Sequence, residues 1–346
     1  MALKAEYEPL TNKNLRGQVI VPVLPLSNQS DLASHCRNLR EAGASFLLVN
    51  GLTGGSRWLN PRQRRKYAEQ YVEAARPRYG SKDAMYVLCC LQYPTGENNK
   101  QIVRDGKFMQ DIGVDALVVP APLKAQELKA GGDGALSCLD GLLAQLEDAG
   151  VAAPLLVYDN PRVSYPISID TAATLADRHK SVIGYKNSGS VEHTGKLVDA
   201  LGDRLMISHA DEKTLYEALE AGAHSIAPSM ANLIFTYFSA FMHYIRGNEW
   251  DQAKVMQEEI NGFIEALYPG QEKIPSRLGI ALYWHRNIGR SIRGIPTNPL
   301  IPRKERETNL RHIAQWRKAA KKHTKNELAA LRFVAGRVKR GRKITS

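Results

Sequence analysis

The sequence predicts an α/β protein, a (β/α)8 TIM barrel followed by a C-terminal helical extension. Three observations carry this prediction. Short apolar runs recur eight times between residues 19 and 227, separated by polar or amphipathic stretches, an alternation typical of a parallel sheet covered by helices. An Ala-Gly or Ile-Gly pair precedes several of these runs. The chain of 346 residues has room for such a barrel, which takes about 250 residues, and for an appendage.

The eight apolar runs are the predicted strands, because each is short and rich in aliphatic residues. They are Val19–Leu24, Phe46–Val49, Ala84–Leu91, Ala116–Val119, Leu155–Tyr158, Val182–Tyr185, Leu205–Ile207 and Ser225–Ala227. Eight units with continuous apolar strands favour a closed barrel. An open, doubly wound sheet is the alternative.

Helices are predicted between the strands from their end signals. Asn60-Pro61 is a good helix start, because Pro suits the first helical position and Asn can cap it. Each Ala-Gly or Ile-Gly pair gives the preceding helix a left-handed stop, at 42–43, 112–113, 149–150 and 221–222. The predicted helices include Asp31–Ala42, Pro61–Arg76, Asn98–Ile112, Asp170–Arg178 and Glu212–Ala221.

After Ala227 the chain is predicted to be wholly helical. The helices expected there are Leu233–Arg246, Trp250–Leu267, Arg277–Ile288 and a last block from Arg303 onward, beyond a Pro-rich link at Ile295–Pro302. We therefore predict a barrel catalytic domain at 1–230, a C-terminal helical domain at 231–302 and a basic helical extension at 303–346.

The formal net charge of +12 belongs to the C-terminal extension alone, because the segment from Arg303 to Lys343 holds 15 Lys or Arg and three Glu. A basic arm can hold an anionic partner such as a nucleic acid, and a solvated helix face explains the same charge. We favour a third hypothesis, in which an apolar stripe packs on the barrel or on a neighbouring subunit. The stripe is Leu310, Ile313, Trp316, Leu328, Leu331 and Val334. Nucleic-acid binding is therefore not expected.

Composition and spacing argue against several classes of protein. No run of about 18 apolar residues occurs and the first 14 residues are polar, so we expect no membrane span, no secretory signal and a cytoplasmic protein. The four cysteines lack paired metal spacing and are expected to be reduced core thiols. The sequence has no HExxH motif and no dinucleotide fingerprint, so no metal and no cofactor are expected.

Lys186 is the sharpest chemical feature, because the active site of a barrel lies at the C-terminal ends of its strands. Lys186 follows the apolar run Val182–Tyr185. A lysine there is partly desolvated and can attack a carbonyl carbon, and the imine that forms draws electrons from the neighbouring carbon. A C–C bond beside that carbon can then be made or broken. The alternative is a lysine that only extends to solvent.

Two other strand ends carry candidate groups. The glycine-rich turn 51–56 after the second strand could hold a carboxylate with its backbone N–H groups, and Thr53 and Ser56 add hydroxyl donors. Tyr158, at the end of the fifth strand, could relay protons and orient a substrate through its hydroxyl. A plain connection at 51–56 and an aromatic side chain packed at the barrel rim are the alternatives.

Together these features resemble the dihydrodipicolinate synthase / N-acetylneuraminate lyase family. In that family a glycine-rich turn binds the carboxylate of a keto acid, a Tyr in a Tyr-Asn-x-Pro segment handles protons, and a Lys in Gly-Ile-Lys forms the imine. The matching segments here, in the same order, are Gly51-Leu52-Thr53-Gly54-Gly55, Tyr158-Asp159-Asn160-Pro161, Gly184-Tyr185-Lys186, Ser208-His209-Ala210-Asp211 and Ile226-Ala227-Pro228-Ser229-Met230-Ala231-Asn232. The resemblance covers about residues 15 to 295.

The resemblance implies a Schiff-base-forming class I lyase or aldolase that acts on pyruvate or a related 2-oxo acid and on an aldehyde. It implies Lys186 as the imine lysine and Tyr158 as the proton-handling group. Substrate contacts are expected from Thr53, Leu52, Gly54, Ser56, Arg162, Asn187 and His209. Family members are commonly homotetramers or homodimers, so an oligomer is expected.

Departures from the family pattern narrow the expected activity. Leu52 stands where dihydrodipicolinate synthases have a hydroxyl residue of their proton relay, and Ala121-Pro122 stands where they present a Tyr pair. Their arginine for the aldehyde's carboxylate falls at Val163, with Arg162 beside it. We therefore expect a divergent member that is not itself a dihydrodipicolinate synthase. A dehydratase or hydratase-aldolase with the same imine is one alternative. A non-catalytic barrel whose basic tail binds an anionic partner is another.

Overall fold

Eight parallel strands form one sheet in chain order. The computed structural model describes residues 9–23, 29–54, 59–76, 84–94, 99–123 and 134–267. Its strands are β1 (Ile20–Pro22), β2 (Phe46–Val49), β3 (Tyr86–Cys90), β4 (Ala116–Pro120), β5 (Leu155–Asp159), β6 (Val182–Asn187), β7 (Met206–His209) and β8 (Ser225–Ile226). Each strand pairs in parallel with the next along the chain. Every predicted strand overlaps an observed one.

The sheet closes into a barrel where its first and last strands meet. Val19 forms a parallel bridge with Ile226, and the Ile226 N–H donates to the carbonyl oxygen of Gln18 at 3.1 Å. An open sheet would leave these two edges apart, so the open alternative is excluded. The predicted (β/α)8 barrel is confirmed.

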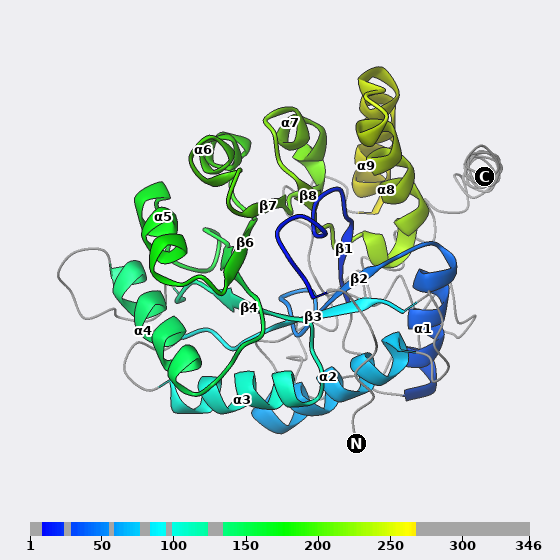
Figure 1. Cartoon of the computed structure of the whole chain (residues 1–346). Coiled ribbons are helices and arrows are strands. Elements are labelled where there is room, and N and C mark those ends of the chain that lie inside the picture. The colour runs from blue at the N-terminus through cyan, green and yellow to red at the C-terminus, as the bar shows by residue number, and fades with distance from the viewer. Residues whose placement is uncertain are drawn as a thin grey trace, which may run out of the picture.

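Helices surround the strands (Figure 1). Their bounds are α1 (Gln29–Glu41), α2 (Pro61–Ala75), α3 (Lys100–Asp111), α4 (Gly134–Asp148), α5 (Ile169–Arg178), α6 (Val191–Leu201), the 3-10 turn η2 (Glu212–Thr214), α7 (Leu215–Glu220), α8 (Ala231–Arg246) and α9 (Trp250–Leu267). None of the helices that the structure describes is both long enough and apolar enough to cross a bilayer.

The helix signals in the sequence act as expected. Asn60 and Gln63 form a capping box at the start of α2, in which each side chain accepts from the other's backbone N–H at 2.9 Å. The predicted left-handed stops are confirmed by positive φ angles of 96°, 88°, 77° and 89° at Gly43, Gly113, Gly150 and Gly222. Such angles disfavour every residue with a Cβ atom, so the end of each helix is encoded locally.

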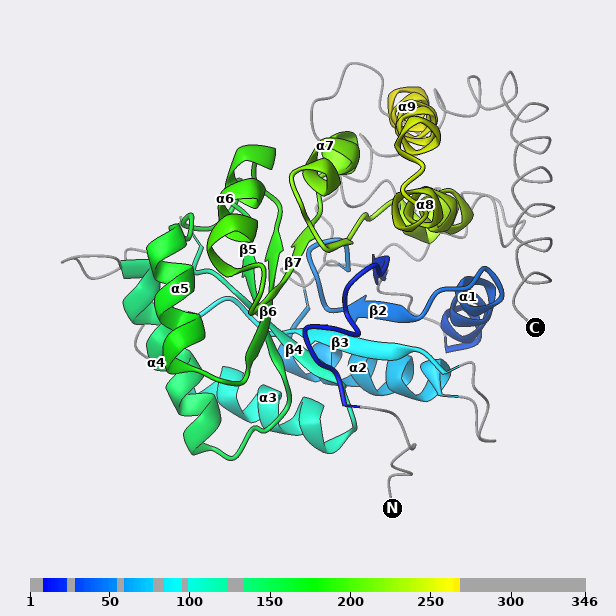
Figure 2. The same cartoon turned by 45° about the horizontal axis from the view of Figure 1, so that its top comes forward.

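The helices α8 and α9 lie side by side in the ring between α7 and α1 (Figures 1 and 2). Phe238 and Phe241 of α8 belong to the same buried cluster as the outward-facing strand residues, so the barrel core continues into α8. The predicted boundary after residue 230 stays a prediction. The predicted helix Arg277–Ile288, the extension 303–346 and its apolar stripe lie outside the described residues.

Strand alternation sorts the buried residues into an inner and an outer cluster. The inner cluster fills the barrel and comprises Leu10, Leu15, Ile20, Phe46, Leu48, Leu88, Cys90, Ala116, Val118, Leu156, Tyr158, Met206 and Ala227. The outer cluster lies between strands and helices and includes Val21, Leu47, Cys89, Leu117, Val157, Tyr185 and Ile207. All four cysteines are free and buried, and Cys89 and Cys90 face opposite sides of β3.

The interior beneath the end of β6 has no room for an added methyl group. A Cβ atom at Gly184 would lie 3.1 Å from Leu156 Cγ, 3.1 Å from the Met206 carbonyl oxygen and 3.3 Å from Met206 Cε. We expect Gly184→Ala to lower the free energy of unfolding by about 1–3 kcal/mol, the usual effect of overpacking. Chemical denaturation measures this change.

The matched control is Gly141→Ala in the middle of α4, where an added Cβ meets nothing within 4 Å. Because glycine in a helix interior costs about 0.5–1 kcal/mol relative to alanine, this variant should be more stable than the parent. Equal stability of the two variants would contradict the tight packing described for Gly184.

Candidate active site

Lys186 lies inside the barrel at the C-terminal end of β6. It is in register with Tyr158 of β5 on one side and with Ser208 of β7 on the other. Only 6% of Lys186 is exposed. Its Nζ atom lies 3.9 Å from the centroid of the Tyr158 ring, which places the cation on the negative face of the aromatic ring. The structure thus brings together the two residues predicted to carry the chemistry.

A chain of hydrogen bonds connects the amine of Lys186 to the phenol of Tyr158. Lys186 Nζ donates to Ser188 Oγ at 3.2 Å, and Ser188 Oγ lies 3.5 Å from the Tyr158 hydroxyl. The Tyr158 hydroxyl also accepts from Asn160 Nδ2 at 3.0 Å. All four side chains are buried. The amine and the phenol are therefore held as one polar group within an apolar interior.

The strand itself positions Ser188. Its backbone N–H donates to the carbonyl oxygen of Asp159 at 2.9 Å, which continues the pairing of β6 with β5 for one more residue. Because side chains two residues apart on a strand share a face, Ser188 projects inward beside Lys186.

The surroundings of the Lys186 amine are neutral. Lys186 forms no ion pair with any residue that the structure describes. Burial raises the pKa of the Cys90 thiol to about 12, although the positive charges of Lys186 and then Arg64 oppose the rise. Cys90 is therefore protonated at neutral pH and contributes an uncharged wall to the same interior layer.

The turn after β2 begins with a left-handed residue. Asn50 has φ of 57°, and its Nδ2 atom donates to the Arg64 carbonyl oxygen at 3.1 Å. A Cβ atom at Gly54 would lie 3.0 Å from the Val23 carbonyl oxygen, so a side chain there would crowd the turn against the end of β1. Thr53 is buried in this turn, and Leu52 packs on the inner cluster. Ser56 lies outside the described residues.

Asn187 and His209 are not brought to the Lys186 face, because alternation points both side chains outward. Thr194 of α6 binds both: its hydroxyl lies 2.8 Å from Asn187 Nδ2 and 2.8 Å from His209 Nδ1. His209 Nε2 lies 3.1 Å from the Thr214 hydroxyl. Their polar atoms therefore join the strands to α6 and η2, and this arrangement does not support substrate contact by either side chain.

Arg162 lies at the rim of the barrel. Its guanidinium binds the carboxylate of Asp211, with side chains 39% and 28% exposed. Arg162 follows β5 and Asp211 follows β7, so the pair spans the mouth above β6. An exposed pair of this kind is worth only about 0–1 kcal/mol, so a carboxylate on a ligand can compete with Asp211 for the guanidinium.

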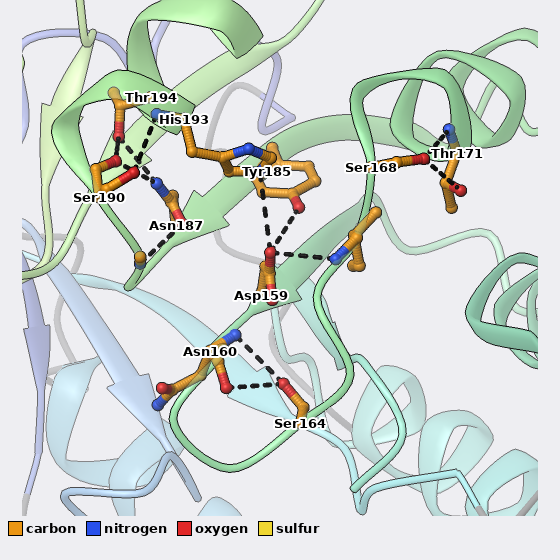
Figure 3. Close-up of polar contacts among 12 residues, drawn as sticks. Asp159, Asn160, Ser164, Ser168, Thr171, Tyr185, Asn187, Ser190, His193 and Thr194 are labelled. Carbon is orange, nitrogen blue, oxygen red and sulfur yellow. Dashed lines mark hydrogen bonds and ion pairs between the residues drawn. The ribbon is translucent and has the colours of Figure 1, made fainter. Parts of the chain in front are cut away.

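A buried carboxylate supports the strand ends from behind (Figure 3). Asp159 Oδ2 accepts from the Ile167 N–H at 3.2 Å and the Tyr185 hydroxyl at 3.3 Å, and lies 3.8 Å from His193 Nε2. Burial, and then the charge of Asp159, raises the pKa of Tyr185 well above its ordinary value. Tyr185 is therefore a permanent donor to Asp159. These contacts fix β5 and β6 against each other just behind Tyr158 and Lys186.

Ser208 is a polar group that the sequence analysis did not select. Met206 belongs to the inner cluster and Ile207 to the outer one, so alternation points Ser208 into the barrel beside Lys186. Its hydroxyl is fully buried and has no hydrogen-bond partner among the residues that the structure describes. The sequence signal for its inward direction was the alternation of side chains along the strand, with a period of two, over Met206-Ile207-Ser208.

Within the described part of the chain, no three acidic, His or Cys side chains converge in a way that could hold a metal ion. The candidate site therefore consists of an amine, hydroxyl groups, a glycine-rich turn and a guanidinium at the rim. This set suits a substrate with a carbonyl group and a carboxylate.

Comparison with known proteins gives one consistent family. Residues 27–313 match the model of the dihydrodipicolinate synthetase family. A 4-hydroxy-tetrahydrodipicolinate synthase from Exiguobacterium sibiricum is 26% identical over 214 residues, which cover 61% of this chain and 68% of that protein.

Two solved structures share the fold. A sialic acid aldolase from Ruminococcus gnavus superposes with a TM-score of 0.69 at 14% identity, over 89% of this chain and 99% of that one. A prophage protein of the dihydrodipicolinic acid synthase family from E. coli K12, solved in complex with pyruvate, superposes with a TM-score of 0.67 at 17% identity, over 87% and 98% of the two chains.

The unpaired hydroxyl of Ser208 should cost the free protein stability. A buried polar group without a partner costs about 1–3 kcal/mol. We expect Ser208→Ala to raise the free energy of unfolding by about 1 kcal/mol and the melting temperature by about 2–4 °C. Differential scanning calorimetry of the ligand-free protein measures both.

Ser225→Ala is the matched control, because Ser225 is the register partner of Ser208 on β8 and is equally buried. Its hydroxyl donates to the carbonyl oxygen of Leu15, so its removal should destabilise the protein by about 1 kcal/mol. A loss of stability in both variants would show that Ser208 has a partner in solution.

Stability should fall as the solution is acidified. Burial lowers the pKa of His209 from 6.5 to about 4, so between these values the unfolded chain binds a proton that the folded chain does not. The free energy of unfolding should therefore decrease as pH falls from about 6.5 to about 4, by up to about 1.4 kcal/mol per pH unit for this one residue. Urea titrations across this range measure the slope. A His209→Gln variant with an unchanged slope would contradict the assignment.

Proposed function

Since this chain belongs to the dihydrodipicolinate synthetase family, we propose that it is a Schiff-base-forming class I lyase or aldolase acting on pyruvate or a related 2-oxo acid. The observation that carries the proposal is the position of Lys186. Its amine is buried at the C-terminal mouth of the barrel, on the Tyr158 ring and in contact with Ser188. An amine in this position can attack a carbonyl carbon. Among the described residues, no carboxylate forms an ion pair with it.

The turn at the end of β2 is proposed to hold the substrate's carboxylate. Gly51 and Gly54 let the backbone approach closely, and Thr53 supplies a hydroxyl. Successive N–H groups in such a turn form an anion-binding concavity. The C2 carbonyl then points across the barrel toward Lys186, and Ser56 belongs to the same proposed turn.

Lys186 attacks C2 and expels water to give a protonated imine, with Tyr158 as the proton-handling group. The imine nitrogen draws electrons from C3, so that the bond between C3 and C4 breaks to release an aldehyde, or forms by addition of C3 to an aldehyde. This proposed role of Tyr158 is supported by its hydroxyl, which belongs to the same hydrogen-bonded group as the amine.

Arg162 is the group proposed to meet the far end of the substrate, where a second carboxylate would exchange with Asp211. Leu52 gives the opposite side an apolar surface. That apolar surface favours one second candidate, a dehydratase or hydratase-aldolase that uses the same imine. A cytoplasmic homodimer or homotetramer is part of the same proposal.

Reductive trapping tests the function. Treatment with pyruvate and borohydride should add a three-carbon group to the peptide that contains Lys186, as read by mass spectrometry. Lys186→Met should abolish the adduct, because it removes the amine and keeps the side-chain volume.

The control is Lys196→Met, on the exposed face of α6 where Lys196 binds Glu192, and it should leave the adduct unchanged. If pyruvate and larger 2-oxo acids all failed to label the parent protein, the proposed function would be wrong.

A further inference from the structure

We propose that Ser188 is a catalytic residue that carries a proton between the amine of Lys186 and the phenol of Tyr158. This role rests on the proposed imine chemistry and adds a third group to it. Among the described side chains, Ser188 alone forms a hydrogen bond to both the amine and the phenol, at 3.2 Å and 3.5 Å. The longer distance exceeds the ~2.5–3.0 Å usual for an O–H···O hydrogen bond, and catalytic contacts that are long without substrate shorten when substrate closes the site.

The direction of the chain follows from its donors. The Asn160 amide is fixed, because its Oδ1 atom accepts from the Arg162 N–H at 3.3 Å and its Nδ2 atom therefore faces Tyr158. The phenol oxygen thus accepts from both Asn160 and Ser188. Because both of these groups donate to the phenol oxygen, the O–H group of Tyr158 can itself donate to a substrate oxygen. Every donor points from the amine, through Ser188, to the phenol.

The proton transfer that this chain allows is balanced. Attack of the neutral Lys186 amine on C2 leaves a positive nitrogen and a negative oxygen on the substrate. The amine gives one proton to Ser188 Oγ, Ser188 gives its own proton to the Tyr158 oxygen, and Tyr158 gives its own proton to the substrate oxygen. One N–H bond is broken, one O–H bond is formed on the substrate, and Ser188 and Tyr158 are regenerated. Once the amine is neutral, the step needs no further acid, base or water.

The other nearby groups do not bridge the amine and the phenol, and the Ser208 hydroxyl forms no hydrogen bond to either of them. Leu52 has no hydroxyl and packs on the inner cluster. Asn187 and Thr194 bind each other on the outer face of β6. The pKa of Cys90 is raised to about 12 by burial, so its thiol holds its proton. Ser188 has the required position because the pairing of its N–H with Asp159 extends β6 to that residue.

The rate of imine formation tests the role of Ser188. Full-length parent and variants are mixed with pyruvate, and borohydride is added after a set delay, so that adduct mass against time gives a single-turnover rate. In Ser188→Ala this rate should fall by about 100-fold, the lower end of what positioned acid–base groups contribute. Ser188→Thr keeps the hydroxyl and should retain most of the rate. The Ser188→Ala rate should also rise with the concentration of a small buffer acid, whereas the parent rate should not.

Ser181→Ala is the matched control, because Ser181 precedes the same strand at its other end and binds Glu147. It should react at the parent rate, and the melting temperatures of all variants verify folding. If Ser188→Ala forms the adduct at the parent rate, or if Ser188→Thr is as slow as Ser188→Ala, Ser188 is not the proton carrier although the imine function stands. If the parent forms no adduct with any 2-oxo acid, the function and the relay fall together.

Discussion

Burial of the Lys186 amine against the face of Tyr158 is the interaction on which the rest of this site depends. A buried cation is costly unless other groups compensate for lost water, and here the compensation comes from an aromatic ring at 3.9 Å and a hydroxyl at 3.2 Å instead of a carboxylate. The amine therefore has compensating contacts but no carboxylate partner among the described residues.

This environment exists because parallel pairing places β5, β6 and β7 side by side with their ends level. Register alone sets Tyr158, Lys186 and Ser208 in one inward row, and the residues that alternate with them support that row from the outer face. Asp159 joins Tyr185 and the Ile167 backbone, and Asn187 joins Thr194. The inward-facing and the supporting groups therefore occupy adjacent positions on the same strands, which keeps the candidate site on rigid elements.

The same alternation explains what could be predicted from the sequence. Strand positions, helix stops and the place of Lys186 followed from local patterns, because apolar runs, Ala-Gly pairs and a lysine at a strand end are each visible within a few residues. The contacts of His209 and Asn187 did not, because they depend on Thr194 of the neighbouring helix. The bond between Ser188 and Tyr158 joins residues 30 apart, and a single sequence contains no sign of that contact. The inward direction of Ser208 could be predicted from strand alternation, but in the sequence this residue resembles an ordinary core serine.

One side of the barrel mouth is polar and the other is apolar, and this difference affects the side from which protons can reach a substrate. Hydroxyl groups gather on the side of β5, β6 and β7, from Tyr158, Ser188 and Ser208, whereas Leu52 presents an apolar surface from β2. If the β2 turn holds the carboxylate of a substrate, the C2 oxygen lies near these hydroxyl groups only when the carbonyl group is directed toward β5. Protons would then reach the substrate from one face, and the apolar face would be left for the group that adds to or leaves from C3. The position of Leu52 would then help to decide which face of the substrate reacts, because a hydroxyl group in its place would offer a second source of protons.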